Sequence, residues 1–286
     1  MTLDDCRRFY AEEIRFVANL DSSALVEALA RVPREKFLGP GPWQVAFPEI
    51  RSDTTTYTTT YTTIDDPREV YHNVLIALDV TRGLNNGQPS ALARWINRLN
   101  LRAGDRVLHV GCGVGYYTAI MAELVGATGR VVACEVESDL AFRARENLDS
   151  YPNVTVHAGD GAVLDPGICD AIFINAGVTH VHLPWLARLS DGGRIVLPLT
   201  TGSGRGVMVK IIRDHDDFAA QVVGEVAIYF CTSVRDPRLE PVIETALSTG
   251  TLLKLKSVRR DSHEQTDTCV LHRGDVCLSS LELAAH

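Results

Sequence analysis

Three turns in the middle of the chain carry residue types suited to binding a nucleotide-like ligand. The first, Gly111–Gly115 (Gly-Cys-Gly-Val-Gly), follows a short apolar run, and its glycines permit a tight bend and close backbone approach. Glu135 lies about 20 residues further on, after the next apolar run, where a carboxylate can accept hydrogen bonds from ribose hydroxyls. The third turn, Gly159-Asp160-Gly161, offers a carboxylate that could accept from an adenine amino group. An ordinary Asx turn would also explain Asp160.

These turns belong to a segment in which short apolar strands alternate with helices. The predicted strands are Arg106–Val110, Arg130–Cys134, Val154–His157, Asp170–Ile174 and Arg194–Leu197, and the predicted helices are Tyr116–Val125, Ser138–Leu148 and His182–Leu189. Such alternation predicts an α/β fold with a doubly wound sheet. Loops at the carboxyl ends of its strands meet at one edge, so the three turns should lie together there.

The next two apolar runs favour one class of nucleotide-binding fold over another. Gly206–Ile212 and Gln221–Tyr229 are separated only by a short polar segment, which predicts an antiparallel pair. A dinucleotide-binding fold normally continues parallel, and its motif would require glycine where Tyr116 stands. A reversed final pair instead resembles the class I methyltransferase fold, a Rossmann-like sheet with an antiparallel terminal strand.

The two ends of the chain are expected to add to this core. The sequence divides into an N-terminal helical and substrate-side segment (1–90), a cofactor-binding core (91–232) and a C-terminal α+β extension (233–286). We expect helices over Asp4–Arg31 and Asp236–Thr249, and strands over Leu252–Val258 and Thr268–Ser279. The Thr- and Tyr-rich run Ser52–Thr63 could be a strand or flap beside a substrate cleft, or a surface strand or mobile loop.

Charge and cysteine content narrow the class of protein. The net charge of −8 argues against a nucleic-acid partner, which normally selects a basic face. The seven cysteines are odd in number and lack Cys-x-x-Cys spacing, so we expect reduced thiols in a cytoplasmic protein, without a disulfide framework or a metal site. No apolar run approaches the roughly 20 residues of a membrane span. We therefore expect neither a membrane nor a nucleic-acid partner.

From about Tyr10 to about Phe230 the chain resembles protein-L-isoaspartate O-methyltransferases. The matching segments include an N-terminal Pro-Arg-Glu-x-Phe element as well as the glycine loop, and they are Val32–Phe37, Leu101–Leu108, Gly111–Thr118, Glu135, Asn153-Val154, Gly159–Gly161, Asp170–Ile172 and Leu189–Pro198. The resemblance implies S-adenosyl-L-methionine as cofactor.

By this resemblance, Gly111, Gly113 and Gly115 hold the methionine part of the cofactor, Glu135 the ribose, and Asp160 with Gly161 the adenine. Four neighbours of these turns complete the predicted cofactor-binding set: His109, Tyr116, Val136 and Asn175.

The chain departs from the family where substrate and methyl donor meet. The family has Thr-Ile-Ser-x-Pro there, and this chain has Asn85-Asn86-Gly87-Gln88-Pro89, so Gly87 replaces the serine. We expect Asn85, Asn86 and Gln88 to orient the acceptor. His180, after the fourth strand, is the candidate base, although it could equally be an ordinary loop histidine.

Several functions remain open at this point. The sequence shows no convincing set of residues for a general base, which favours O-methylation of a carboxylate, because an ionised carboxylate needs no base. With the family's serine missing, the acceptor is expected to be a divergent one, on a peptide or a small-molecule acid. The alternatives are the isoaspartyl repair reaction of the family itself and a non-catalytic protein that binds S-adenosylmethionine as a partner. An NAD-dependent oxidoreductase is disfavoured by Tyr116. The sequence allows a homodimer but does not indicate an oligomeric state.

Overall fold

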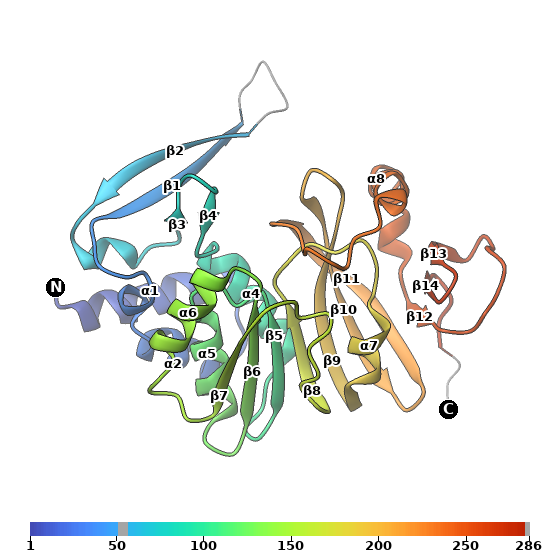
Figure 1. Ribbon diagram of the computed structural model, residues 1–286, viewed down its shortest axis with the longest axis horizontal. Helices are drawn as coiled ribbons and strands as arrows, with labels where there is room; N and C mark the ends of the chain where they lie inside the picture. The colour runs from blue at the N-terminus through green and yellow to red at the C-terminus, as the bar shows by residue number, and fades with distance from the viewer. Residues whose placement is uncertain (51–56, 284–286) are drawn as a thin grey trace.

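A ten-stranded mixed sheet is the centre of the computed structural model, which describes residues 1–50 and 57–283 (Figure 1). In spatial order its strands are β13 (Cys269–Arg273), β14 (Val276–Ser279), β12 (Ser257–Arg259), β11 (Asp217–Ala227), β10 (Arg205–Asp214), β9 (Leu189–Thr200), β8 (Cys169–Ile174), β5 (Arg106–Val110), β6 (Arg130–Glu135) and β7 (Val154–Ala158). Strands β9, β8, β5, β6 and β7 run parallel, and β10 and β11 are antiparallel to their neighbours. The predicted α/β class and the antiparallel pair are confirmed.

Helices cover both faces of this sheet, and each face has its own hydrophobic core. The helices are α1 (Leu3–Ala18), α2 (Ser23–Arg31), α3 (Arg34–Phe37), α4 (Pro89–Leu99), α5 (Tyr116–Val125), α6 (Ser138–Asn147), α7 (Leu183–Ala187) and α8 (Glu240–Ser248), with 3-10 turns at Pro67–Val70, Pro237–Leu239 and Thr251–Lys254. Buried residues of α1–α6 share one core, and those of α7 and α8 share the other. Alternation along β5 explains the division, since Val107 faces the first core and Leu108 the second.

The N-terminal segment forms two helices where the sequence predicts one run. Thr2 begins α1 with a capping box, and Asn19 ends it in the left-handed conformation. Ser22 then caps α2 by accepting a hydrogen bond from the Leu25 amide. Both helices bury apolar side chains in the core that α4 and α5 share, so the segment packs directly on the methyltransferase-like core.

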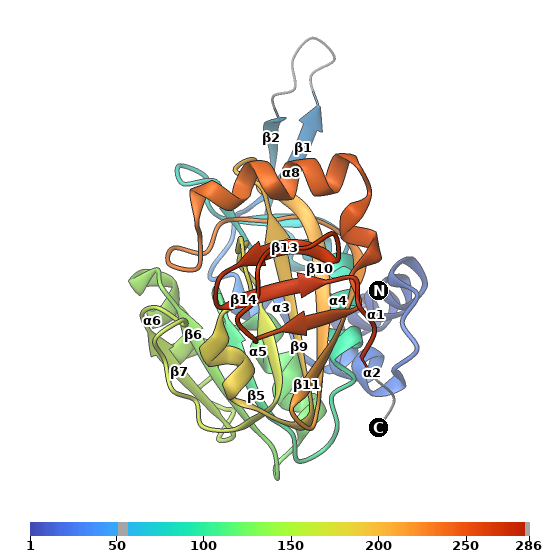
Figure 2. The same cartoon turned by 90° about the vertical axis from the view of Figure 1, so that its right-hand side faces the viewer.

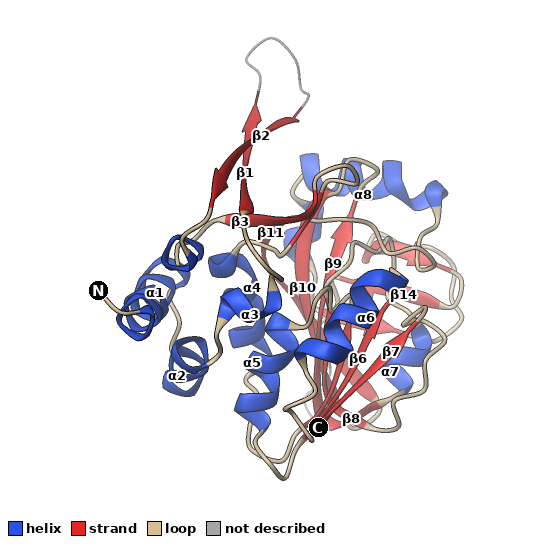
Figure 3. Cartoon of the chain, turned by 60° about the vertical axis from the view of Figure 1, so that its left-hand side comes forward, coloured by secondary structure: helices blue, strands red, loops and turns tan. Residues whose placement is uncertain are grey.

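A four-stranded antiparallel sheet, in the order β2-β1-β3-β4, projects from the body beside the carboxyl edge of the large sheet (Figure 3). Its strands are β1 (Trp43–Ile50), β2 (Tyr57–Ile64), β3 (Leu75–Asp79) and β4 (Leu84–Asn85). The predicted strand in the Thr- and Tyr-rich run is therefore found over Tyr57–Thr63, and the earlier part of the run, residues 52–56, lies outside the described residues.

The C-terminal extension continues the large sheet. Its strands β12, β14 and β13 follow β11 in the sheet, and they lie across β9–β11 at one end of the molecule (Figure 2). The predicted strand over Leu252–Val258 is wrong for its first part, because Thr251–Lys254 form a 3-10 turn that buries Leu252. The predicted strand pair over Thr268–Ser279 is confirmed as β13 and β14. Among the described residues, no helix has the length and apolar character to span a bilayer.

His109 lies in the first core. Its ring is fully buried, stacks on Phe173 at 5.3 Å between centroids, and pairs through Nδ1 with Thr118 Oγ1 at 2.9 Å. Burial lowers the pKa of His109 to about 3, so the folded protein keeps this ring neutral.

We expect the shared second core to make the extension essential for stability. Leu278 of β14 is buried against Val258 and Leu271, so Leu278→Ala should lower the free energy of unfolding by about 2–4 kcal/mol. The control is Leu253→Ala. Leu253 is 72% exposed, so this substitution should lower the free energy of unfolding by less than about 0.5 kcal/mol. Urea unfolding measures both, and equal stabilities of the two variants would contradict the shared core.

The buried His109 ring predicts a loss of stability in mild acid. Below the ordinary pKa of 6.5 the unfolded chain binds a proton at this ring that the folded chain does not, so stability falls as pH falls toward 3. This ring should account for about 2 kcal/mol of the loss between pH 7 and pH 5. His109→Leu should flatten the dependence by that amount in urea unfolding. An unchanged slope in His109→Leu would contradict the assignment.

Candidate active site

The glycine loop between β5 and α5 has a backbone that only glycine adopts readily. Gly111, Gly113 and Gly115 all have positive φ angles, of 77°, 56° and 91°. A Cβ at Gly111 would lie 3.0 Å from the carbonyl oxygen of Asn175, and one at Gly115 would lie 2.7 Å from Leu148 Cδ1. The loop is thus packed closely on its protein side, and these glycines leave a smooth backbone surface for a ligand.

Glu135 connects the end of β6 to this loop. Its Oε2 accepts a hydrogen bond from the Gly113 amide at 2.7 Å, and its Oε1 accepts one from the Glu137 amide at 3.1 Å. The side chain is buried, which raises its pKa, while the two amide donors oppose that effect. Each oxygen keeps further acceptor capacity, so the carboxylate is fixed in a position where it can also accept from hydroxyl groups.

Three further residues of the predicted cofactor-binding set, Val136, Asp160 and Gly161, lie near Glu135, and the Gly159 amide donates to the Glu135 carbonyl at 2.8 Å. Val136 follows Glu135 and is 45% exposed, which is unusual for an apolar side chain next to a buried one. Asp160 Oδ1 accepts from the Ala162 amide and from Ser233 Oγ, both at 2.9 Å. Gly161 closely approaches β5, since a Cβ there would lie 2.6 Å from Val110 Cγ1.

Asn175 belongs to the same edge. It follows β8, and its Nδ2 donates to the Gly111 carbonyl at 3.1 Å, which braces the glycine loop. By contrast, His109 and Tyr116 turn away from this edge. His109 pairs with Thr118 in the core, and the buried Tyr116 hydroxyl faces that of Tyr10 at 3.4 Å. Any cofactor contact of these two residues would therefore come from the backbone.

The segment predicted to orient an acceptor approaches the far end of the antiparallel strands. Asn85 Nδ2 donates to the Tyr229 hydroxyl at 2.8 Å, and Tyr229 in turn donates to the Gly83 carbonyl. The Gly177 amide donates to the Tyr229 carbonyl at 2.6 Å, which brings the loop after β8 to the same place. Asn85, Tyr229 and Gly177 thus join three segments that are distant in the sequence.

Asn86 and Gln88 differ in their surroundings. Asn86 is buried, its amide donates to the Ile76 carbonyl at 2.8 Å, and its side-chain Nδ2 is buried without a hydrogen-bond partner. Such an unpaired donor costs about 1–3 kcal/mol unless a ligand satisfies it. Gln88 is exposed at the start of α4, and Gly87 between them has φ of 75°.

Arg82 fixes this segment to the cofactor side of the site. Its guanidinium bonds Asp79 Oδ2 and Glu137 Oε2, both at 2.7 Å, and Asp139 Oδ2 at 2.6 Å. Glu137 is two residues beyond Glu135, at the start of α6. Arg82 is therefore engaged by three carboxylates of the chain itself, and it holds the β3–β4 turn against α6.

His180 lines a cavity that the acceptor segment does not line. It lines a cavity of about 660 Å³ together with Asp160, Asp236 and Arg273, and the lining of that cavity includes none of Asn85, Asn86 and Gln88. The ring is buried, pairs with Thr179 Oγ1 at 3.1 Å, and has its pKa lowered to about 4, chiefly by burial. The geometry therefore does not bring His180 together with the other predicted catalytic residues.

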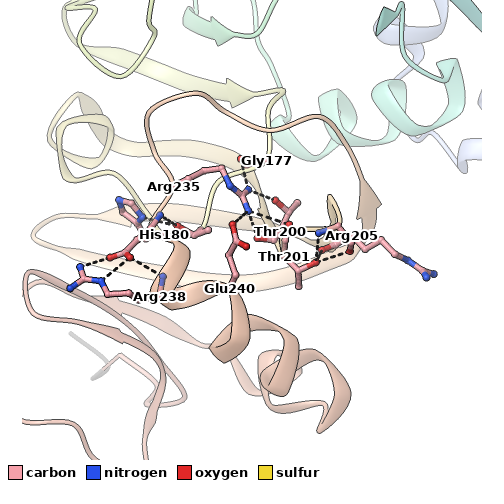
Figure 4. Close-up of polar contacts among 11 residues, drawn as sticks. Gly177, His180, Thr200, Thr201, Arg205, Arg235, Arg238 and Glu240 are labelled. Atoms are coloured by element: carbon pink, nitrogen blue, oxygen red, sulfur yellow. Dashed lines mark hydrogen bonds and ion pairs between the residues drawn. The ribbon is translucent and has the colours of Figure 1, made fainter. Parts of the chain in front are cut away.

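Arg235 stabilises the loop between Asn175 and His180. Its guanidinium donates to the Gly177 carbonyl at 3.0 Å, to Thr200 Oγ1 at 2.9 Å and to Glu240 Oε1 at 2.6 Å (Figure 4). It also stacks over the Phe230 ring at 4.4 Å. The loop after β8, the end of β9 and the start of α8 are thus joined by one side chain.

Sequence reasoning missed three residues of this region: Tyr229, Ser233 and Arg235. Their common signal is position, since all three follow β11 and face loops at the carboxyl edge. Periodicity alone does not distinguish such residues from ordinary strand-end residues.

Solved structures share this fold. The chain aligns with a protein-L-isoaspartate O-methyltransferase at a TM-score of 0.58 and 22% identity, which covers 83% of this chain and 69% of that one. It also aligns with a beta-aspartate methyltransferase from Plasmodium falciparum in complex with S-adenosyl-L-homocysteine, at a TM-score of 0.61 and 17% identity, over 79% of this chain and 98% of that one.

Sequence comparison identifies the family. The chain is 34% identical over 203 residues to protein-L-isoaspartate O-methyltransferase 1 of Archaeoglobus fulgidus, which covers 70% of this chain and 82% of the relative. It is 30% identical over 215 residues to the protein-L-isoaspartate O-methyltransferase of Rhodopseudomonas palustris, over 72% and 84% of the two chains. The family model for protein-L-isoaspartate(D-aspartate) O-methyltransferase matches residues 12–235. The chain therefore belongs to the protein-L-isoaspartate(D-aspartate) O-methyltransferase family.

Proposed function

We propose that this chain transfers a methyl group from S-adenosylmethionine to a carboxylate of a peptide or protein, with the isoaspartyl carboxylate as the first candidate. S-adenosylmethionine is the methyl donor of the family. The observation that carries the proposal is the Glu135 carboxylate, which the Gly113 and Glu137 amides fix beside the glycine loop. Membership of a family named for methylation of isoaspartate supports the acceptor.

The donor site fits the residues present. We assign the ribose hydroxyls to Glu135, the methionine part to the glycine loop, and the adenine ring to the exposed Val136 side chain. Both hydrogen bonds of Asp160 reach Oδ1, so Oδ2 is our candidate acceptor for the adenine amino group. When bound, the donor supplies an electrophilic methyl group on a sulfonium.

The residues of the chain have to position the acceptor rather than activate it. A carboxylate is already ionised at pH 7, so it can attack in line without a general base. The lowered pKa makes His180 a weak base, and the cavity that His180 lines does not include Asn85, which supports a mechanism without His180. Asn85 and the unpaired Nδ2 of Asn86 are our candidates to donate hydrogen bonds to the acceptor carboxylate.

A second candidate is a peptide carboxylate other than isoaspartate. Gly87 stands where the family has serine, and its φ of 75° disfavours any other residue. A Cβ there would also lie 2.9 Å from Leu92 Cδ2. The backbone and packing of the segment therefore require glycine at this position. The side-chain amides of Asn85 and Asn86 would replace the missing hydroxyl. The small-molecule acid considered from the sequence receives no support from relatives named for a protein-borne acceptor.

The proposed ribose contact predicts a specific loss of affinity. Glu135→Gln should weaken binding of S-adenosylhomocysteine about 10- to 100-fold, because an amide replaces an ionised acceptor at a buried position. Glu146→Gln, at an exposed residue of α6, is the matched control and should bind as the wild type does. Titration calorimetry measures both, and equal affinity of Glu135→Gln and wild type would refute the assignment.

The acceptor is tested with a pair of peptides that differ only in one linkage. Each peptide has an amidated C-terminus and one aspartyl residue, in the normal or the isoaspartyl form. Methyl transfer is followed by the methanol that base releases from the methyl ester. We expect turnover of the isoaspartyl peptide only, since its free α-carboxylate is the group that the family methylates. If S-adenosylhomocysteine binds but neither peptide is methylated, the isoaspartyl assignment fails, and a wider panel of acidic peptides tests the second candidate.

A further inference from the structure

Four potential metal ligands meet in the C-terminal extension, beyond the residues that the family model matches. They are His263, Cys269, His272 and Cys277, and one ligand atom from each lies within 4.8 Å of every other. Cys277 is buried and the other three are partly buried. The cluster lacks Cys-x-x-Cys spacing in the sequence, so the sequence alone does not predict it.

The β13–β14 strand pair presents three of these residues together. His272 and Cys277 are directly opposite each other in the antiparallel register. Cys269 is three positions before His272, and strict alternation would place the two on opposite faces. The register shifts between Cys269 and Leu271, as in a β-bulge, which brings Cys269 to the same side. A bulge of this kind commonly redirects a side chain at a functional site.

The surroundings of the two histidines are compatible with metal coordination. His263 Nδ1 is 2.9 Å from the Asp261 carbonyl, and this bond turns Nε2 toward Cys269 Sγ at 3.5 Å. A metal-bound histidine normally donates a hydrogen bond from its second ring N–H to a carboxylate, a backbone carbonyl or water. His272 Nδ1 is buried without a hydrogen-bond partner, a costly arrangement that a metal bond would remove.

The sulfur of Cys269 is surrounded by donors. The Thr266 amide donates to it at 3.3 Å, and Thr266 Oγ1 lies 3.5 Å away. Donors directed at a sulfur favour the thiolate, which is the form that binds metals.

We propose that His263, Cys269, His272 and Cys277 bind one structural Zn²⁺ ion. Two thiolates and two imidazoles are a preferred tetrahedral set for zinc, and the two thiolates balance its charge in a partly buried site. With bonds of about 2.3 Å to sulfur and about 2.0 Å to nitrogen, a tetrahedral ion separates sulfur from nitrogen by about 3.5 Å. The distance from Cys269 Sγ to His263 Nε2 has this value.

The site would stabilise the extension and one wall of the cavity beside His180. Residues 260–268, which carry His263, contain no helix or strand, so the ion would fix this loop to the β13–β14 pair. Arg273 and Asp275, at the turn of that pair, line the cavity with His180 and Asp160. Four protein ligands leave no open position, so the ion has a structural role and is not catalytic.

The test is elemental analysis of the full-length protein, purified under reducing conditions without a metal-binding tag. We expect about one zinc per chain in the wild type. Cys269→Ser and His263→Gln should each lower bound zinc at least about tenfold. The controls Cys6→Ala and His157→Gln change the same residue types outside the cluster and should keep the full zinc content.

Cobalt substitution gives a readout that does not require the variants to fold. Wild-type protein exchanged into Co²⁺ should show thiolate-to-cobalt charge-transfer bands and the strong visible bands of a tetrahedral ion. If the wild type is freed of zinc, loaded with Co²⁺ and still gives no such spectrum, the proposal is overturned. A Cys269–Cys277 disulfide in the intact mass of the purified protein would overturn it as well, because those sulfurs could not then bind the ion.

Discussion

The carboxylate of Glu135 is the constraint on which the rest of the site depends. Its two amide donors come from the glycine loop after β5 and from the start of α6, so one side chain sets the spacing of two parallel strand ends. This is possible only because Gly111 and Gly115 let the loop pack closely on Asn175 and Leu148. Because β5 and β6 run parallel, the loops that follow them lie side by side at the carboxyl edge of the sheet. All proposed cofactor contacts lie at this edge.

The meeting of the three turns proposed to hold the cofactor could be predicted from sequence, because their signals are local. A glycine loop after a strand, an acidic residue after the next strand and a further acidic turn each depend on a few consecutive residues, and parallel topology brings them together. The same reasoning assigned His109 and Tyr116 by proximity in sequence, whereas their side chains point into the core. Alternation along β5 and the direction of α5 decide those orientations.

The acceptor half and the extension depend on contacts between distant residues. The pairing of Asn85 with Tyr229 spans 144 positions, and no periodicity predicts it. The four residues of the proposed zinc site are likewise joined by a register shift in β13 that apolar patterning does not reveal. The run Leu252–Val258 reads as a strand by composition, yet Gly250 in a left-handed conformation starts a 3-10 turn there. Where local propensity is ambiguous, tertiary packing therefore decides which secondary structure forms.

The ion pairs of Arg82 make the two halves of the active site sensitive to ionic strength. One guanidinium holds Asp79, Glu137 and Asp139 near the surface, which leaves an excess of negative charge beside Glu135. Dissolved salt screens such partly exposed pairs within a Debye length of about 8 Å at physiological concentration. Added salt should therefore weaken the attachment of the β3–β4 turn to α6.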